Sequence, residues 1–258
     1  MLNSLYIGAT GMQAQQNNID AISNNLANVN TTGYKRSRVD FSDLLYHAVT
    51  SSGSGDPTAG VGRLGMGVAM AGNSKTFTAG DMKQTSQPLD MAINGQGFLE
   101  VLMPDGSTSY TRSGALQLNQ DGRLVTQDGY PLAQSIIVPP DATKVRIDPN
   151  GQVFATLAAH KLPVELGQIS LANFTNPAGL TAMGNNLYVA TERSGDPMMG
   201  NPGENGSGTI QQGYLEGSNV QLVDEMVSLI IAQRAYDINA KVVQASDQLL
   251  SISNNLYR

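Results

Sequence analysis

The chain lacks cysteine entirely and carries few charged residues. Without cysteine it can form neither a disulfide framework, nor a thiol nucleophile, nor a cysteine zinc site, and it tolerates either redox compartment. Charged residues make up 14% of its 258 residues, and the net charge is -6. Basic residues cluster only at Lys35, Arg36 and Arg38. We therefore expect no nucleic acid as the main partner, because phosphate binding requires many cations.

Long hydrophobic runs and a secretory leader are also missing. No stretch of about eighteen apolar residues occurs, so we expect no transmembrane segment. Residues 1–12 contain neither a basic stretch nor a sustained apolar one, so we expect no cleaved signal peptide. With 40% hydrophobic residues, the chain is long enough to fold around a core in one or two domains.

Residues typical of catalytic and metal sites are scarce. His47 and His160 are the two histidines, and neither has a second ligand at helical spacing, so we expect no metal. Gly95-Gln96-Gly97 begins like a dinucleotide-binding loop, but position 100 is Glu and no helical pattern follows. A tight turn between strands explains this stretch better. We expect no cofactor and no enzymatic activity.

A long helical repeat occupies the C-terminal end. Residues 220–258 contain neither glycine nor proline, and apolar residues recur there at alternating spacings of four and three. An average of about 3.5 residues places these side chains on one stripe that can follow a partner helix. The pattern predicts a helix over 218–258, with Ser218 or Asn219 as its N-cap. The stripe consists of Ile231, Ala235, Ile238, Val242, Ala245, Leu249, Ile252 and Leu256.

A second helix is predicted over residues 1–33. Its apolar positions lie seven residues apart, and the turn residues 30–33 suit a helix C-terminus. We expect the helix at 1–33 to be the partner of the stripe and to pair with 218–258 as an inner core domain. The apolar positions are Leu5, Met12, Ile19 and Leu26.

The polar side of the first helix is rich in amides and poor in charges. Residues 1–30 contain one charged residue, Asp20, and ten amides, which include Asn24, Asn25 and Asn28. A solvated helix face usually carries Lys and Glu, whereas amides cost less than ions to bury if they find hydrogen-bond partners. We interpret the helix as buried on several sides by neighbouring chains. The alternative is a simple two-helix stalk that is amide-rich.

The chain between the two helices divides into two parts by composition. Residues 34–72 predict an extended connector with an insertion, and residues 73–217 predict a β-rich outer domain, because turn residues there punctuate short β-branched runs. The fold class is therefore α+β, with paired, coiled-coil-like terminal helices and an inserted, mostly antiparallel all-β domain. Hairpins are expected at Asp105-Gly106, Asp121-Gly122 and Asp128-Gly129. Further strands are expected at 135–138, 144–147, 152–155, 167–174 and 186–190.

The connector allows two interpretations. A Ser- and Gly-rich stretch such as 51–72 is a flexible linker when considered in isolation. Because apolar residues, including Val61, Leu64 and Met66, remain interleaved in it, the segment can instead extend and order against a neighbouring molecule.

Three separated blocks of short motifs occur in the order found in one family. The first contains Asn24-Asn25-Leu26-Ala27-Asn28 and Thr32-Gly33-Tyr34-Lys35, the second Ile93-Asn94-Gly95-Gln96-Gly97-Phe98 and Tyr110-Thr111-Arg112, and the third Gly213-Tyr214-Leu215-Glu216 and Gln233-Arg234-Ala235-Tyr236. With these blocks the chain resembles the bacterial flagellar basal-body rod proteins over nearly its full length. Its length and its insertion at 46–67 resemble the distal-rod members most, and the proximal-rod members are the alternative.

This resemblance implies a structural subunit that polymerises with itself into an open, hollow helical shaft. The shaft would cross the periplasm as the rod of the basal body, transmit motor torque to the hook and pass exported subunits. The implied partners are proximal-rod proteins, the hook protein, the L- and P-ring bushing around the rod, and the flagellar type III export apparatus. Export by that apparatus agrees with the expected absence of a cleaved signal peptide.

Two other classes of protein are alternatives to a structural subunit. One is an enzyme with a β-rich catalytic domain, which would need clustered titratable residues. The other is an adhesin-like, β-rich binding module, which would act as a monomer.

Two sets of residues are expected to carry the function of the shaft. Contacts of the connector with axial neighbours are expected to stiffen the shaft, through Tyr46, Val61, Leu64 and Met66. The expected subunit interface consists of Leu5, Met12, Ile19, Leu26, Asn24, Asn25, Asn28, Ile231, Ile238, Val242, Leu249, Ile252 and Leu256.

Overall fold

The chain divides into two compact units. The computed structural model describes residues 2–44, 46–49, 62–158 and 162–256. One unit, which we term the helix unit, comprises Met1–Ala27, Ser37–Ser74 and Gln221–Arg258. The other, the β unit, comprises Asn28–Arg36 and Lys75–Val220.

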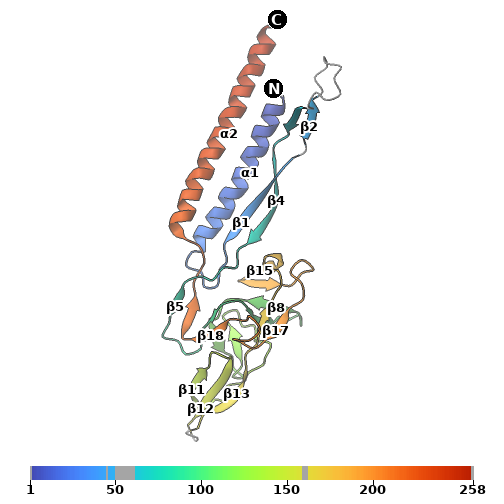
Figure 1. Cartoon of the computed structure of the whole chain (residues 1–258). Coiled ribbons are helices and arrows are strands. Elements are labelled where there is room, and N and C mark those ends of the chain that lie inside the picture. The colour runs from blue at the N-terminus through green and yellow to red at the C-terminus, as the bar shows by residue number, and fades with distance from the viewer. Residues whose placement is uncertain (1, 45, 50–61, 159–161, 257–258) are drawn as a thin grey trace. The chain divides into compact units, whose positions relative to one another are not determined.

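Two antiparallel helices, α1 (Leu2–Ala27) and α2 (Leu222–Leu256), lie side by side in the helix unit (Figure 1). The α2 helix continues without a break because its sequence contains neither glycine nor proline. After α1 the chain turns, with the Thr31 amide donating to the Asn28 carbonyl at 3.2 Å and Gly33 adopting a φ of 70°. The prediction that the two terminal helices pack together is confirmed.

The α2 helix begins later than the sequence predicted. Its first residue is Leu222, and the Glu225 amide donates to the carbonyl of Gln221 at 3.0 Å, which makes Gln221 the N-cap. The Asn219 side chain is used elsewhere, because it accepts from the Arg36 amide at 2.7 Å and donates to the Thr76 carbonyl at 2.7 Å. An amide engaged by two other segments is not available to cap a helix.

Four strands complete the described part of the helix unit. Within this group β1 pairs with β4, and β2 pairs antiparallel with β3. Much of the predicted connector is therefore β-structure, with β1 and β4 beside α1 (Figure 1). Residues 50–61 of the predicted insertion lie outside the described residues. The strand bounds are Ser37–Asp43 for β1, Tyr46–Val49 for β2, Gly62–Gly65 for β3 and Val68–Lys75 for β4.

Polar side chains join α1 to these strands. The buried Asn25 side chain donates to the Ser37 carbonyl and accepts from the Ser37 amide, both at 2.9 Å. Further along α1, Asn17 donates to the sulfur of Met70 at 3.6 Å. These contacts occupy one side of α1 with the chain's own strands.

In its described residues, the β unit consists of short strands and one 3-10 helix. The bounds of its strands are Met82–Gln84 (β5), Met91–Asn94 (β6), Phe98–Leu102 (β7), Thr108–Thr111 (β8), Leu116–Leu118 (β9), Leu124–Thr126 (β10), Ala142–Ile147 (β11), Gln152–Leu157 (β12), Val164–Gln168 (β13), Leu171–Asn173 (β14), Thr181–Gly184 (β15), Leu187–Val189 (β16), Met198–Gly200 (β17), Thr209–Gln212 (β18) and Tyr214–Glu216 (β19). The 3-10 helix η1 is Pro177–Gly179.

These strands form one large and several small antiparallel sheets. In the described part of the β unit, the largest sheet has six strands in the order β15-β16-β8-β7-β14-β17, and a second has the order β11-β12-β13. Three further pairs join β9 to β10, β6 to β18 and β5 to β19. All of these pairings are antiparallel. The prediction of an inserted antiparallel β domain is confirmed.

The three predicted hairpin turns agree with the structure, whereas two of the predicted strands do not. Gly106, Gly122 and Gly129 all adopt positive φ in their turns, as the Asp-Gly pairs predicted. The strand predicted at 135–138 is wrong, because Ser135 has a φ of 42° and Ile137 makes only an isolated bridge to Arg123. The strand predicted at 167–174 is divided between β13 and β14.

The β unit contains a dense apolar core. Leu99, Val101, Ile169 and Leu171 are at most 1% exposed and belong to one cluster of buried aliphatic side chains. A neighbouring aromatic cluster packs edge to face, for example with Tyr110 and Phe174 centroids 4.8 Å apart. This unit therefore has the packed interior expected of an independently stable domain.

Candidate assembly surface

The seam between α1 and α2 includes small residues that let the two helices lie close together. A Cβ placed on Gly8 would lie 2.7 Å from Val243 Cγ2, and one placed on Gly11 would lie 2.9 Å from Asn239 Nδ2. The absence of a Cβ at these two glycines therefore lets the helices approach closely. The other buried residues of the two helices include Ala14, Ile22, Ala232 and Ser246.

The seam ends in a buried polar contact between the two helices. Asn25 Nδ2 donates to Glu225 Oε2 at 3.3 Å, and both residues are 1% exposed. Asn25 was predicted at the subunit interface, but its side chain is buried against residues of its own chain. It does not belong to the exposed surface of the helix unit.

The apolar stripe of α2 does not face α1, which corrects the prediction that the stripe forms the intramolecular seam. Ile231, Ile238, Val242, Leu249 and Ile252 are 43–63% exposed. Since successive residues rotate by roughly 100° around a helix, this stripe lies about a quarter-turn from the seam. The pairing face is the one with small residues, because only that face allows close approach of the backbones.

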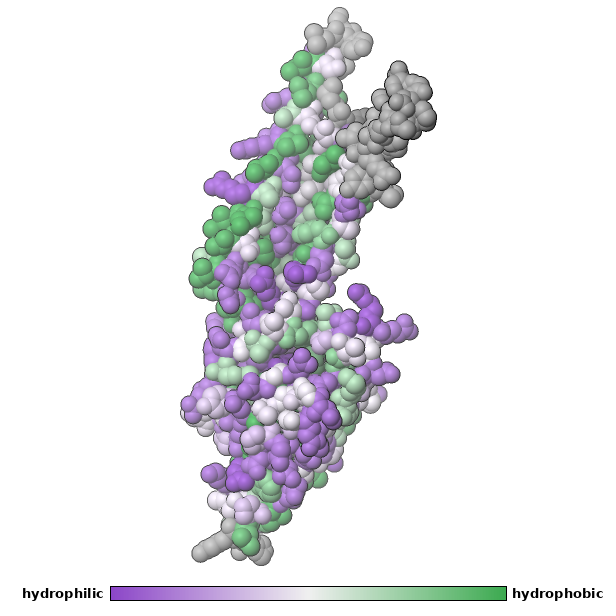
Figure 2. Space-filling model, in the orientation of Figure 1, coloured by the Kyte–Doolittle hydropathy of each residue, from purple (hydrophilic) through white to green (hydrophobic). Residues whose placement is uncertain are grey.

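A second exposed apolar patch covers the first turns of α2. Leu222, Val223, Met226, Val227 and Ile230 are 47–69% exposed. In Figure 2, hydrophobic residues gather along much of α2. A contiguous exposed apolar surface of this kind is typical of an interaction site.

The predicted interface residues of α1 are less exposed. Leu5, Met12, Ile19 and Leu26 are half-buried. Asn24 is exposed, whereas Asn28 is half-buried in the β unit, where its side-chain oxygen accepts from Thr31 Oγ1 at 3.1 Å. The side chain of Leu256, the last predicted interface residue, lies outside the described residues.

The structure describes little of the predicted stiffening segment. Met66 is half-buried. Tyr46 and Leu64 belong to β2 and β3, where they pair with Gly65 and His47, but their side chains are not described. Val61 lies outside the described residues. The stiffening role therefore stays a prediction.

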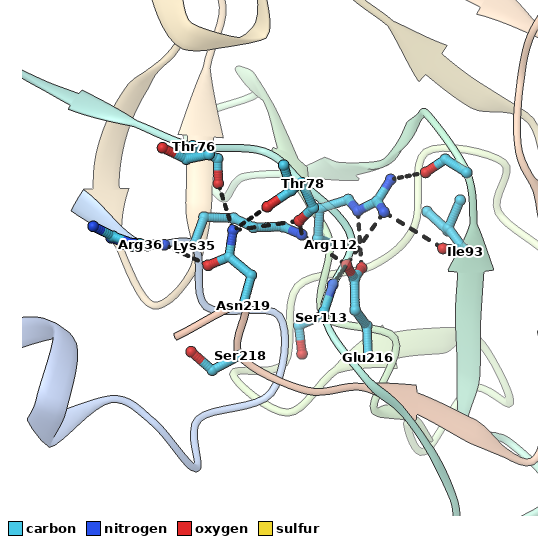
Figure 3. Close-up of polar contacts among 12 residues, drawn as sticks. Lys35, Arg36, Thr76, Thr78, Ile93, Arg112, Ser113, Glu216, Ser218 and Asn219 are labelled. Atoms are coloured by element: carbon cyan, nitrogen blue, oxygen red, sulfur yellow. Dashed lines mark hydrogen bonds and ion pairs between the residues drawn. The ribbon is translucent and has the colours of Figure 1, made fainter. Parts of the chain in front are cut away.

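A buried ion cluster in the β unit joins three segments that are distant in the sequence (Figure 3). Glu216 accepts from Lys35 Nζ at 2.6 Å through Oε1 and from Arg112 Nε at 3.0 Å through Oε2. The side chains of Lys35 and Glu216 are completely buried, and that of Arg112 is 4% exposed. Backbone carbonyls complete the shell, with Lys35 donating to Thr78 at 2.7 Å and Arg112 donating to Gly97 at 2.6 Å.

Burial and the neighbouring charges shift the pKa values of Glu216 and Lys35 in opposite directions. Burial alone would raise the pKa of Glu216, but the positive charges of Arg112 and Lys35 outweigh it, so this pKa lies below its ordinary value. Burial lowers the pKa of Lys35, and the adjacent Glu216 carboxylate opposes that shift. Removing one partner would leave an uncompensated charge in an apolar interior.

No sequence pattern predicted this cluster, although each of its members belongs to one of the motifs that resemble the rod-protein family. Lys35 ends Thr32-Gly33-Tyr34-Lys35, Arg112 ends Tyr110-Thr111-Arg112, and Glu216 ends Gly213-Tyr214-Leu215-Glu216. The charged ends of motifs from all three blocks meet at one site. Lys35 and Glu216 are 181 residues apart, and no local pattern predicts a contact over that separation.

The cluster also fixes the two segments of the β unit that continue into the helix unit. Lys35 follows α1 in the chain, and Glu216 precedes α2. The Gly33 amide also donates to the Glu216 carbonyl at 2.8 Å. Glu216 therefore anchors both segments in the β unit.

In the part of the chain that the structure describes, neither helix is long and apolar enough to cross a membrane.

Three family models match successive parts of the chain. Residues 5–35 match the family described as flagella basal body rod protein, and residues 92–155 match the flagellar hook protein FlgE/F/G D1 domain. Residues 211–256 match the flagellar basal body rod FlgEFG protein C-terminal family. These matches include the predicted terminal helices and part of the β unit.

Individual relatives extend the similarity over nearly the whole chain. The flagellar basal-body rod protein FlgG of Buchnera aphidicola subsp. Schizaphis graminum is 45% identical over 254 residues, which cover 97% of this chain and 98% of that protein. FlgG of Agrobacterium fabrum is 44% identical, with 99% and 100% of the two chains covered. FlgG of Bacillus subtilis is 37% identical over the full length of both chains.

Proposed function

The chain belongs to the FlgG family of flagellar basal-body rod proteins, and we propose that it builds the rod by polymerising through the exposed apolar faces of its helix unit. It is a structural subunit of the distal rod and not an enzyme. The three relatives described above carry the FlgG name at 37–45% identity. Their similarity favours a distal-rod subunit over the proximal-rod alternative.

The observation that carries the proposal is the exposure of the α2 stripe. Ile231, Ile238 and Leu249 are each more than half exposed in the single chain. Fully burying a side chain of this kind contributes about 1.5–3 kcal/mol, so a neighbour that covers the whole stripe gains several such contributions. A monomer that remained alone would gain none of them.

The assembled form accounts for the mechanical role that the family resemblance implies. Identical subunits joined by contacts that do not close form an open helical assembly, which can surround a lumen. Such a shaft transmits torque from the motor to the hook and passes exported subunits. Its partners are other rod and hook proteins, the L- and P-ring bushing around it, and the type III apparatus that exports its subunits.

Assembly can be tested by placing a charge on the stripe. We expect concentrated wild-type protein to form tubes or stacked oligomers in negative-stain images and to sediment faster as concentration rises. Leu249→Asp should abolish this assembly, because the interface would have to bury an unpaired carboxylate. The control is Gln248→Asp, which changes the adjacent exposed residue of the polar face and should leave assembly intact.

Two results would contradict the proposal. One is wild-type protein that remains monomeric at every concentration, as expected of a β-rich binding module. The other is Leu249→Asp protein that assembles as readily as wild type. Circular dichroism of both variants would establish that their helices are retained.

A further inference from the structure

The two apolar stripes of the helix unit lie on opposite faces of the α1–α2 pair. On α1, the residues that contact β1 and β4 include Asn17 and Asn25. The stripe Leu5, Met12, Ile19 and Leu26 lies roughly half a turn away from that strand-contacting side, as about 3.6 residues per turn require. It is therefore on the side of α1 that the chain's own strands leave uncovered.

The position of the α2 stripe follows from the antiparallel arrangement. Seen from the N-terminal end of α1, residues advance clockwise along α1 and anticlockwise along α2, because both helices are right-handed. From that viewpoint each stripe lies about a quarter-turn clockwise from the seam on its own helix. For two helices that face each other, the same sense of rotation places the stripes on opposite faces of the pair.

The two stripes follow the same repeat and are similar in length. The α1 stripe extends over 21 residue steps, from Leu5 to Leu26, and the α2 stripe over 25, from Ile231 to Leu256. At about 1.5 Å per residue they are about 32 Å and about 38 Å long, so the α2 stripe can cover the α1 stripe along its whole length. Both follow the seven-residue repeat that lets two helices remain in contact along their length.

The residues beside the α1 stripe suit a buried contact. Gln16 and Ser23 are exposed next to it, and Asp20 is the single acidic residue of α1, which has no basic residue. An uncharged rim costs less to desolvate than a rim of Lys and Glu. The face is therefore suited to another protein surface rather than to bulk water.

We propose that the α2 stripe of one copy packs against the α1 stripe of a second copy in the same orientation, so that helix pairs stack front to back. This inference rests on the proposed function, since it specifies which faces meet in the assembly. The second copy's α1 would run antiparallel to α2, which repeats the orientation of the α1–α2 pair within one chain.

Front-to-back stacking explains why the assembly does not stop at a dimer. Each copy would use its α2 stripe for one neighbour and its α1 stripe for another. A contact between two different faces is heterologous, and repeating it gives an open series rather than a closed pair. Contact between two α2 stripes would instead be isologous and would favour a closed dimer.

Disulfide trapping tests this pairing cleanly because the chain has no cysteine of its own. Single-cysteine proteins with different tags are mixed, assembled and oxidised, so that a mixed disulfide reports an intermolecular contact. One protein carries Ile238→Cys. The other carries Leu5→Cys, Met12→Cys or Ile19→Cys, and the pair that reacts fixes the register.

We expect one of these mixtures to give on the order of tenfold more mixed disulfide than a control with Gln244→Cys, because a bridge requires Cα atoms within about 7 Å. Gln244 is exposed on the polar side of α2. If the proteins polymerise without any mixed disulfide above the control, or if 238–238 disulfides dominate, the front-to-back pairing is wrong while the proposed function stands. If no assembly forms at all, both fail.

Discussion

The helix unit and the β unit use apolar residues in opposite ways. Among the described residues, the helix unit exposes fifteen large apolar side chains and buries four apolar residues, namely Ala14, Ile22, Val39 and Ala232. The β unit buries a continuous core that includes Met91, Leu99, Val101, Leu171 and Ile210, each at most 1% exposed. The first unit places most of its large apolar side chains on its surface, and the second places most of them inside.

This difference shows where each unit obtains its stability. The β unit buries most of its large apolar side chains within one chain. It also pairs the buried charges of Lys35, Arg112 and Glu216 with one another. The helix unit has a thin seam of small side chains, and its larger apolar groups remain available to neighbours. Three experiments test whether the two units differ in this way.

The largest effect is expected from removing the charge of the buried cluster in the β unit. Glu216→Gln leaves Lys35 and Arg112 buried without their carboxylate partner, which should lower the free energy of unfolding by about 3–5 kcal/mol. Urea unfolding followed by near-ultraviolet circular dichroism would measure it, since Tyr110 and Tyr188 lie in the buried aromatic cluster.

The matched control is an ion pair on the surface of the same unit. Arg146 Nε and Asp148 Oδ1 are 3.0 Å apart, with the Arg146 side chain 60% exposed. Asp148→Asn should therefore change the free energy of unfolding by no more than about 1 kcal/mol. A Glu216→Gln protein as stable as this control would show that the buried cluster does not support the β unit.

A pair of identical substitutions compares the two units directly. Leu99→Ala removes a side chain that is 1% exposed in the β unit and should cost about 2–5 kcal/mol of monomer stability. Leu249→Ala removes a side chain that is 56% exposed on α2 and should change monomer stability by about 0.5 kcal/mol or less. Denaturation of dilute monomer gives both values, and equal losses would remove the contrast between the units.

The smallest effect is expected from acid. Because the pKa of Glu216 lies below its ordinary value of 4.5, the unfolded chain binds this proton at a higher pH than the folded chain does. The contribution of Glu216 to stability is then complete above its ordinary pKa and is lost as pH falls towards the folded pKa. The difference in the free energy of unfolding between wild type and Glu216→Gln should become smaller as pH falls from about 6 to about 3. A difference that grows would contradict the assigned direction.

Local sequence patterns predicted the elements of this fold well. The absence of glycine and proline from residues 220–258 predicted α2, and the positive φ of Gly106, Gly122 and Gly129 agrees with the hairpin turns expected at the Asp-Gly pairs. These patterns act over a few residues, so they can be recognised without the fold. The strand predicted at 135–138 failed because Ser135 turns the chain within an otherwise β-like run.

The face used by each helix could not be predicted in the same way. The heptad stripe of α2 suggested the seam with α1, yet Gly8 and Gly11 allow a closer approach on a different face. Periodicity shows that a helix has an apolar stripe, but not which surface covers that stripe. Asn25 was assigned to the interface because the polar side of α1 is rich in amides and poor in charges, but its hydrogen-bond partners lie within its own chain.

Motifs and periodicity are local properties of the chain, and they were enough to predict the family, the two long helices with their seven-residue apolar repeat, and the β-rich insertion. The folded structure was needed to show that Gly8 and Gly11 lie at the seam, that the large apolar stripe faces outward, and that Lys35, Arg112 and Glu216 form one buried cluster. Those features depend on contacts between residues far apart in the chain, up to 181 positions for Lys35 and Glu216. Such contacts are selected by packing and desolvation in the folded chain, which leave no short-range pattern in the sequence.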